Sequence, residues 1–236
     1  MYAPANAAGA PVVVFFYGGA WINGERRWYR YVGEALSRHG IVVMIPDYRK
    51  TKFPAFMDDA AQAVAWARTH AAQFGGDSRQ LFLMGHSAGA HIGALLATDA
   101  RYLSNVGVKP RDLAGFIGLA GPYDFAPFSD DYLLDVFGSD PQAQAAAMPA
   151  NYVDGDEPPM LLLQGLGDNT VWPRNASSLA EKLQARGEAV ETKFYPGLGH
   201  LRIALSLSTP FSRGTTTLSD TLDFIARHGA VGPSAQ

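Results

Sequence analysis

The chain has 236 residues, of which 47% are hydrophobic, and this is enough to build one domain around a single large core. Its net charge of −3 gives no electrostatic reason to expect nucleic acid or an anionic membrane surface as a partner. The absence of cysteine excludes disulfides and thiolate chemistry, and no run reaches the roughly 18 apolar residues that a membrane-spanning helix needs.

Short apolar runs that alternate with helical patterns predict a parallel sheet. In chain order, the expected strands are 12–16, 41–45, 81–84, 115–120, 160–164 and 189–195. Helical spacing predicts helices over 28–39, 53–74, 90–97, 175–186 and 217–228. Apolar parallel strands need helices on both faces. The predicted fold class is therefore α/β, with one domain over residues 1–236 and a mostly parallel sheet of about six strands.

One long excursion interrupts this alternation. Residues 121–159 are rich in Pro, Asp and Ala and show weak periodicity, with short helices expected near 132–137 and 142–147. We expect this segment to form a lid or a wall of a pocket. A smaller feature is Asp47 with Arg49, which we expect to be a structural polar pair.

The strongest chemical signal is the pentapeptide 85–89, Gly-His-Ser-Ala-Gly, which stands between the run 81–84 and the helical run 90–97. In a strand, tight turn and helix of this type, Ser87 lies on a strained turn that exposes its hydroxyl as a nucleophile. The helix that follows directs its first N–H groups, including that of Ala88, toward an anion formed there. The alternative is that Ser87 is an ordinary helix cap in a tight turn.

Three further features follow strands of the predicted sheet. A Gly-Gly pair at 18–19 follows the first strand, Asp168 follows the fifth and His200 follows the sixth. In open α/β sheets, ligands bind outside the carboxyl ends of the strands, so these residues are expected near Ser87. Their order, glycine loop, Ser, Asp and then His, is that of the α/β-hydrolases.

These motifs identify a family resemblance. Tyr-Gly-Gly-Ala-Trp at 17–21, Gly-His-Ser-Ala-Gly at 85–89, Gly-Leu-Gly-Asp at 165–168 and Gly-His at 199–200 resemble the motifs of α/β-hydrolase-fold serine carboxylesterases. The resemblance covers about residues 10–228 and is closest to an esterase and arylformamidase-like group. It implies the α/β-hydrolase fold and hydrolysis of a small-molecule ester without a cofactor.

The chemistry assigns a role to each catalytic candidate. Ser87 is the nucleophile, His200 takes its proton, and Asp168 orients the imidazole and stabilises its charged form. The N–H of Ala88 would hold the oxyanion, and the resemblance implies that the N–H groups of Gly19 and Ala20 do so as well. An acyl group on Ser87 would then be released by water.

Other residues compete for these roles. We expect His91, one helical turn after Ser87, to pack beneath the turn, and His86 to point away from the nucleophile. Asp124 is the main rival for the acid. The remaining candidates are weaker. His39, His70 and His228 are expected on helix surfaces, and Asp156 lies in the excursion.

The loops around the predicted site carry aromatic residues. Trp21, Tyr123, Phe125 and Trp172 are expected to line an apolar pocket for the acyl or alcohol group, with a core role as the alternative for each. No metal site is indicated, because the histidines lack metal-ligand spacing and thiols are absent.

The chain departs from the family pattern in two places. Tyr17 stands where the pattern has a histidine that braces the oxyanion loop, and we expect the tyrosine hydroxyl to substitute for it. The usual N-terminal β-hairpin is expected to be absent, with 2–4 as its remnant. An uncovered edge strand would favour a homodimer. The chain as given lacks a signal peptide, so it is expected in the cytoplasm, or outside it if a longer N-terminus exists.

The leading functional hypothesis is hydrolysis of small carboxylic esters with short acyl chains. An arylformamidase is the alternative enzyme, because both groups share the glycine loop and the serine pentapeptide. An acyltransferase would have the same sequence features, and a non-catalytic ligand-binding member of the fold is a further alternative.

Overall fold

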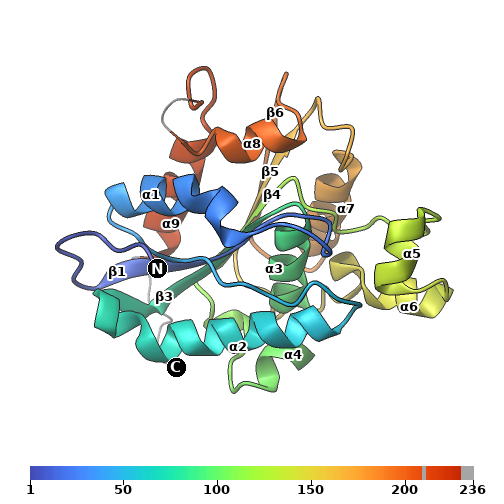
Figure 1. Ribbon diagram of the computed structural model, residues 1–236, viewed down its shortest axis with the longest axis horizontal. Helices are drawn as coiled ribbons and strands as arrows, with labels where there is room; N and C mark the ends of the chain where they lie inside the picture. Colours follow the sequence, from blue (N-terminus) through green and yellow to red (C-terminus); the bar gives the residue numbers. More distant parts are fainter. Residues whose placement is uncertain (209–210, 230–236) are drawn as a thin grey trace.

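The computed structural model describes residues 1–208 and 211–229, and its centre is one parallel sheet. The strand order is β2-β1-β3-β4-β5-β6. Figure 1 shows the sheet between helices. The strands are β1 (Ala10–Phe16), β2 (Val42–Met44), β3 (Gly76–His86), β4 (Gly115–Leu119), β5 (Met160–Gly165) and β6 (Val190–Tyr195). This is the α/β-hydrolase fold, so the predicted fold class is confirmed.

The strand order reverses direction between β1 and β3, which lie side by side with Val12 opposite Leu81. Such a reversal leaves a crevice at the carboxyl ends of the two strands, because their connections leave on opposite sides. The glycine loop follows β1 and Ser87 follows β3. The topology therefore brings the two motifs to the same crevice.

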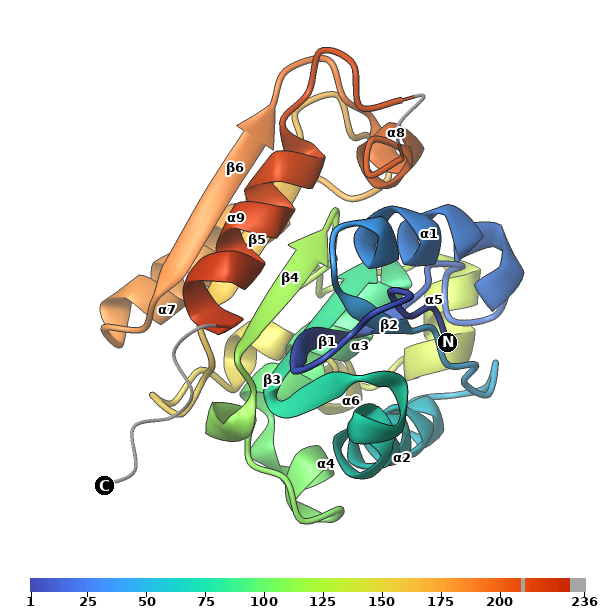
Figure 2. The same ribbon diagram turned by 90° about the vertical axis from the view of Figure 1, so that its left-hand side faces the viewer.

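Helices cover both faces of the sheet. α1 (Arg30–Arg38) and α9 (Thr217–Gly229) pack on one face, whereas α2 (Ala55–His70), α3 (Ala88–Thr98) and α7 (Arg174–Ala185) pack on the other. Figure 2 shows α9 in front of the strands and α7 behind them. Shorter helices are α4 (Ala100–Ser104), α5 (Asp131–Phe137), α6 (Pro141–Ala146) and α8 (His200–Leu205).

α3 lies at the centre of the core, and all of its residues are buried. Its small side chains let it approach the sheet closely: a Cβ at Gly93 would stand 2.8 Å from the ring of Phe116 in β4. Because α3 begins directly after Ser87, this close packing fixes the position of Ser87.

Several boundaries differ from the prediction. β3 begins at Gly76, because its polar first residues extend the ladder to Ala10 beyond the apolar run. The helix predicted over 53–74 ends at His70 and continues to Phe74 as a 3-10 turn. α8 was not predicted.

The pair of Asp47 and Arg49 does not form. Arg49 donates instead to Asp59 on α2 at 2.8 Å, and Asp47 lies 3.4 Å from Arg26. Sequence proximity was misleading here because each side chain reaches a partner on a different element.

The N-terminal segment pairs with the β2 edge of the sheet. Tyr2 and Val43 exchange two backbone hydrogen bonds of 2.8 Å in an antiparallel bridge. In the part of the chain that is described, none of the helices has the length and apolar character to cross a membrane.

Candidate active site

Ser87 lies on a sharp turn between β3 and α3. Its backbone has φ 56° and ψ −124°, a conformation that a residue with a side chain rarely adopts. The turn closes only because its flanking residues are glycines: a Cβ at Gly85 would stand 2.3 Å from the carbonyl oxygen of Gly89, and one at Gly89 would stand 2.0 Å from that of Phe16. The N–H of Ser87 donates to Leu119 at 2.9 Å, which ties the turn to β4.

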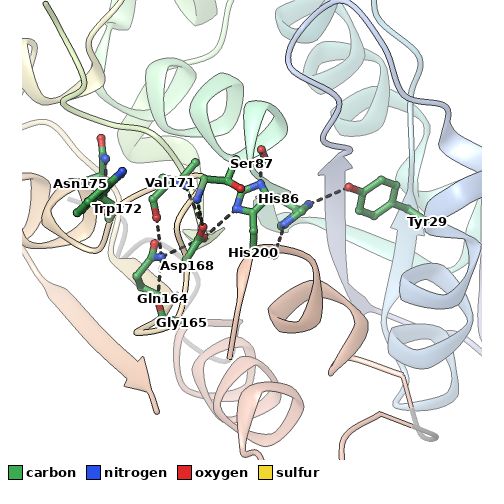
Figure 3. A network of polar contacts seen from close by, with 11 residues as sticks. Tyr29, His86, Ser87, Gln164, Gly165, Asp168, Val171, Trp172, Asn175 and His200 are labelled. Atoms are coloured by element: carbon green, nitrogen blue, oxygen red, sulfur yellow. Dashed lines mark hydrogen bonds and ion pairs between the residues drawn. The ribbon is translucent and has the colours of Figure 1, made fainter. Parts of the chain in front are cut away.

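Three side chains from distant parts of the sequence form one hydrogen-bonded line. His200 Nε2 lies 2.9 Å from Ser87 Oγ, and His200 Nδ1 lies 2.8 Å from Asp168 Oδ2 (Figure 3). A carboxylate can only accept, so the ring carries its proton on Nδ1 and leaves the lone pair of Nε2 for the serine hydroxyl. This tautomer is the one that can accept the proton of Ser87.

The loop after β5 holds Asp168 firmly. Oδ1 accepts from the N–H groups of Thr170 and Val171, both at 2.9 Å, and Oδ2 also accepts from Gln164 Nε2 at 3.2 Å. Burial raises the pKa of Asp168, but the hydrogen bonds from His200, Val171 and Thr170 outweigh burial and bring the pKa below its ordinary value. Asp168 is therefore a carboxylate at neutral pH.

The rival histidines have other partners. Ala147 O can only accept and Trp21 Nε1 can only donate, so His91 donates through Nε2 at 2.7 Å and accepts through Nδ1 at 3.1 Å. Burial lowers the pKa of His91 to about 4 and keeps it neutral. His86 points away from Ser87, toward Tyr29 and the backbone of His200.

The rival carboxylates also lie away from His200. Asp124 accepts from Ser178 on α7, and Asp156 pairs with Arg111. Within residues 1–208 and 211–229, no group of three His, Cys, Asp or Glu side chains is arranged to hold a metal ion.

The glycine loop after β1 has an unusual backbone. Ala20 and Trp21 both have positive φ, at 50° and 61°, and Gly19 has φ 147°. A hydrogen bond of 2.8 Å from the N–H of Asn23 to the carbonyl of Gly19 closes the loop. Ala20 lines the same cavity as Ser87.

Tyr17 does not brace this loop as expected. Its hydroxyl donates to Asp47 at 3.2 Å, and its ring stacks on Tyr48 with 4.7 Å between the centroids. Tyr17 directly follows β1, and its side chain faces the segment after β2, which carries Asp47 and Tyr48. The side chain of Tyr29 lies beside the loop, and its hydroxyl would stand 2.9 Å from a Cβ at Gly18.

A cavity of about 480 Å³ opens beside Ser87. Part of its lining comes from the excursion 121–159, and another part comes from the loop before α7 and the start of that helix. Apolar and aromatic residues of the lining include Trp21, Phe125, Phe128, Tyr132, Leu133 and Trp172. Trp172 is 62% exposed, so it stands at the mouth of the cavity.

Tyr123 does not line the cavity, contrary to the prediction. It is fully buried, and its ring packs edge-on against Phe116 at 6.4 Å between centroids. The chain turns after β4 so that the side chain of Tyr123 fills the space beside Gly118 and Gly121, where a Cβ would clash with it.

Three functional candidates escaped the sequence prediction. Gln164 supports Asp168, Asn175 accepts from the N–H groups of Tyr123 and Asp124, and Tyr29 bonds to His86. Gln164 carried a signal, since it is the polar residue in an otherwise apolar strand. Tyr29 and Asn175 carried none, because their partners lie far away in the sequence.

Comparison with known proteins decides the family, since residues 1–183 match BD-FAE. The chain belongs to the BD-FAE family. Relatives of this BD-FAE member include isoprenylcysteine alpha-carbonyl methylesterase ICME of Arabidopsis thaliana, 29% identical over 93% of the chain and 57% of the relative. Esterase LipC of Mycobacterium tuberculosis is 31% identical over 81% of the chain and 53% of the relative. The chain thus spans about half the length of these relatives.

Solved structures of esterases have the same fold. Esterase 2 of the planctomycete Thermogutta terrifontis with bound propionate has a TM-score of 0.79 and 26% identity, and the match covers 99% of this chain and 90% of that one. A truncated carbohydrate esterase from gut microbiota has a TM-score of 0.82 at 20% identity, over 96% of this chain and 88% of that one, and therefore supports the fold alone.

Proposed function

We propose that this BD-FAE protein is a carboxylesterase that cleaves small carboxylic esters through an acyl-enzyme on Ser87. The observation that carries the proposal is the line from Asp168 through His200 to Ser87, with separations of 2.8 and 2.9 Å. Serine is a weak nucleophile unless a positioned base takes its proton. The relatives and structural neighbours that are named as esterases support the same class of reaction.

In the proposed reaction, Ser87 Oγ attacks the ester carbonyl while its proton passes to His200 Nε2. Asp168 stabilises the imidazolium that results. The imidazolium then protonates the leaving alcohol, which breaks the ester bond and leaves the acyl group on Ser87. His200 next takes a proton from water, whose oxygen attacks the acyl carbon. The imidazolium then returns a proton to Ser87 Oγ as the bond between Oγ and the acyl carbon breaks, which releases the acid and restores the serine.

The oxyanion of each tetrahedral intermediate needs donors that are fixed in advance. We assign this role to the N–H groups of Gly19, Ala20 and Ala88. The last of these is at the first position of α3, where N–H groups are free and the helix dipole is positive. A donor of this kind stabilises the transition state by about 3–4 kcal/mol.

The cavity favours a short acyl chain or a small alcohol. Its volume of about 480 Å³ is at the lower end for small-molecule sites, and Trp21, Phe125 and Trp172 make much of its lining apolar. We propose that 121–159 acts as the pocket wall, since Phe125, Phe128 and the α5 residues Tyr132 and Leu133 already line the cavity.

The test compares initial rates on 4-nitrophenyl acetate, butyrate and octanoate with the rate on an N-formyl aromatic amine. We expect the acetate and butyrate to be cleaved faster than the other two substrates, and Ser87→Ala to remove nearly all of the activity. A faster reaction on the formyl amide would indicate an arylformamidase. Faster transfer of the acyl group to an added alcohol than to water would indicate an acyltransferase. A folded wild type with no rate above the Ser87→Ala control would refute the proposal.

A further inference from the structure

Two buried side chains outside the catalytic line connect the glycine loop to the catalytic histidine. His86 Nε2 lies 2.8 Å from the backbone oxygen of His200, and His86 Nδ1 lies 2.8 Å from the hydroxyl of Tyr29 (Figure 3). His86 is only 1% exposed and Tyr29 only 8%. Neither side chain is hydrogen-bonded to Ser87 Oγ, and neither lines the cavity beside it.

The chemistry of the partners fixes the direction of these hydrogen bonds. The carbonyl of His200 can only accept, so Nε2 of His86 carries the proton. Burial lowers the pKa of His86 to about 3, so the ring stays neutral and Nδ1 has a lone pair. The hydroxyl of Tyr29 therefore donates to His86, and its oxygen is left to accept from another group.

The backbone of the glycine loop lies beside this oxygen at Gly18. Burial raises the pKa of Tyr29 to about 12, and the neighbouring backbone of Gly18 offsets part of this rise. A Cβ at Gly18 would stand 2.9 Å from the Tyr29 hydroxyl and 3.0 Å from His86 Nδ1. Glycine is thus needed at position 18 for this close approach.

Both ends of this chain of contacts belong to groups that the proposed reaction uses. Gly18 directly precedes the proposed donors Gly19 and Ala20, and the carbonyl at the other end belongs to the residue whose ring takes the serine proton. The rings of His86 and His200 are also packed, with 4.9 Å between their centroids. A displacement of about 1 Å in such groups can cost on the order of 10²-fold in rate.

We propose that Tyr29 and His86 are positioning residues that hold the oxyanion loop and the catalytic histidine in register with each other. This inference rests on the proposed ester hydrolysis. It assigns the loop-bracing task, which Tyr17 does not perform, to a residue of the segment before α1 and to the residue that precedes the nucleophile.

The first test is Tyr29→Phe, which removes one oxygen and keeps the ring that packs 5.4 Å from Phe15 between centroids. The concentration of active sites is measured by titration with paraoxon, so that kcat is calculated per folded, reactive enzyme molecule. We expect kcat to fall about tenfold or more while KM changes by less than about twofold, because the substrate pocket is untouched. A kcat per reactive site equal to that of the wild type would overturn the proposal.

Tyr48→Phe is the matched control. Tyr48 is also a buried tyrosine, and its hydroxyl donates to the carbonyl of Tyr17 at 2.9 Å without contacting His86. We expect it to lower the melting temperature with kcat per reactive site within about twofold of the wild type. If Tyr48→Phe lowered kcat as much as Tyr29→Phe, loosening of the strand end would explain both effects, and the proposal would fail.

A double-mutant cycle then tests the connection itself. His86→Gln can still donate to the carbonyl of His200 but offers no acceptor at Nδ1 for Tyr29. Once that contact is lost, we expect Tyr29→Phe to cost less than about twofold in kcat in the His86→Gln background.

The outcomes separate this inference from the proposed function. Equal costs of Tyr29→Phe in the wild-type and His86→Gln backgrounds would show that the two residues act independently, and would refute the inference while leaving ester hydrolysis intact. A wild type that hydrolyses no ester would refute the proposed function, and the inference with it.

Discussion

Replacement of Asp168 by asparagine changes one oxygen to an NH₂ group and leaves the shape of the site nearly the same. The two carboxylate oxygens have different surroundings. Oδ1 accepts from two backbone N–H groups, those of Thr170 and Val171, whereas Oδ2 accepts from the side chains of His200 and Gln164. The backbone donors cannot turn away, so we expect the amide oxygen at Oδ1 and the NH₂ group at Oδ2.

This orientation would reverse the tautomer of His200. An NH₂ group at the Oδ2 position donates to Nδ1, so the histidine proton moves to Nε2 and the ring can no longer accept from Ser87. Loss of the correct tautomer in a serine triad costs about 10⁴-fold in kcat, which corresponds to roughly 5.5 kcal/mol of transition-state stabilisation. The NH₂ group also meets Gln164 Nε2, which already donates to the carbonyl oxygens of Gly165 and Val171.

The assay is kcat on 4-nitrophenyl butyrate for the wild type, Asp168→Asn and the control Asp124→Asn. Asp124 also follows a strand, but its carboxylate accepts from Ser178 and not from a histidine. We expect Asp124→Asn to stay within about threefold of the wild type. If Asp168→Asn lost less than about tenfold, or if the two variants lost equally, the orientation argument would be wrong.

Three further predictions concern stability and assembly. Because burial lowers the pKa of His91 from 6.5 to about 4, the unfolded chain binds a proton that the folded protein excludes between these values. The free energy of unfolding should therefore fall by up to about 1.4 kcal/mol for each pH unit below about 6.5. The free energy of unfolding in urea is measured from pH 7.5 to 5. His91→Gln should remove the contribution of His91 to its fall with pH, and the exposed control His39→Gln should keep it. Equal pH dependences in the two variants would contradict the burial argument. Gly89→Ala places a Cβ 2.0 Å from the carbonyl oxygen of Phe16, so we expect a loss of about 3 kcal/mol in urea unfolding or failure to fold, and wild-type stability would be the opposite result. A homodimer through the edge strand β2 stays a prediction, which a single monomeric species in light scattering would reject.

The sequence predicted the line from Asp168 to Ser87 because each member has a local signal. Ser87 stands in a pentapeptide between a strand and a helix, and Asp168 and His200 directly follow apolar or alternating runs. Parallel strands place their carboxyl ends at one edge of the sheet. The proximity of residues that follow different strands can therefore be predicted without knowing which strands pair. The structure brings these three side chains within hydrogen-bonding distance.

Other parts of the site depend on where side chains point, and the sequence carries little information on this. Tyr123 and Phe125 are two residues apart in the same loop, yet Phe125 lines the cavity and Tyr123 is buried beneath it. Tyr17 keeps the direction set by β1 and reaches Asp47. The contact of Tyr29 with His86 spans 57 positions and joins a 3-10 turn to a strand end, so no local pattern indicates it.

Secondary structure was also predicted best where the sequence has a clear local pattern. Short apolar runs and one alternating run indicated the strands of the sheet, whereas α8 was missed because it is only six residues long and begins at His200, directly after the glycine-rich loop that follows β6. The weak periodicity of 121–159 correctly indicated short helices near α5 and α6. It did not indicate which of their side chains would face Ser87.

The most direct test of the central claim is to identify the residue that becomes covalently modified. Wild type, Ser87→Ala and Ser178→Ala would be treated with paraoxon, digested and analysed by mass spectrometry, with residual hydrolysis of 4-nitrophenyl butyrate measured in parallel. We predict a phosphoryl adduct on the peptide that contains Ser87, formed in step with loss of activity, in the wild type and Ser178→Ala but not in Ser87→Ala. An adduct on another residue, or full inactivation of the wild type with Ser87 unmodified, would contradict the assignment of Ser87 as the nucleophile.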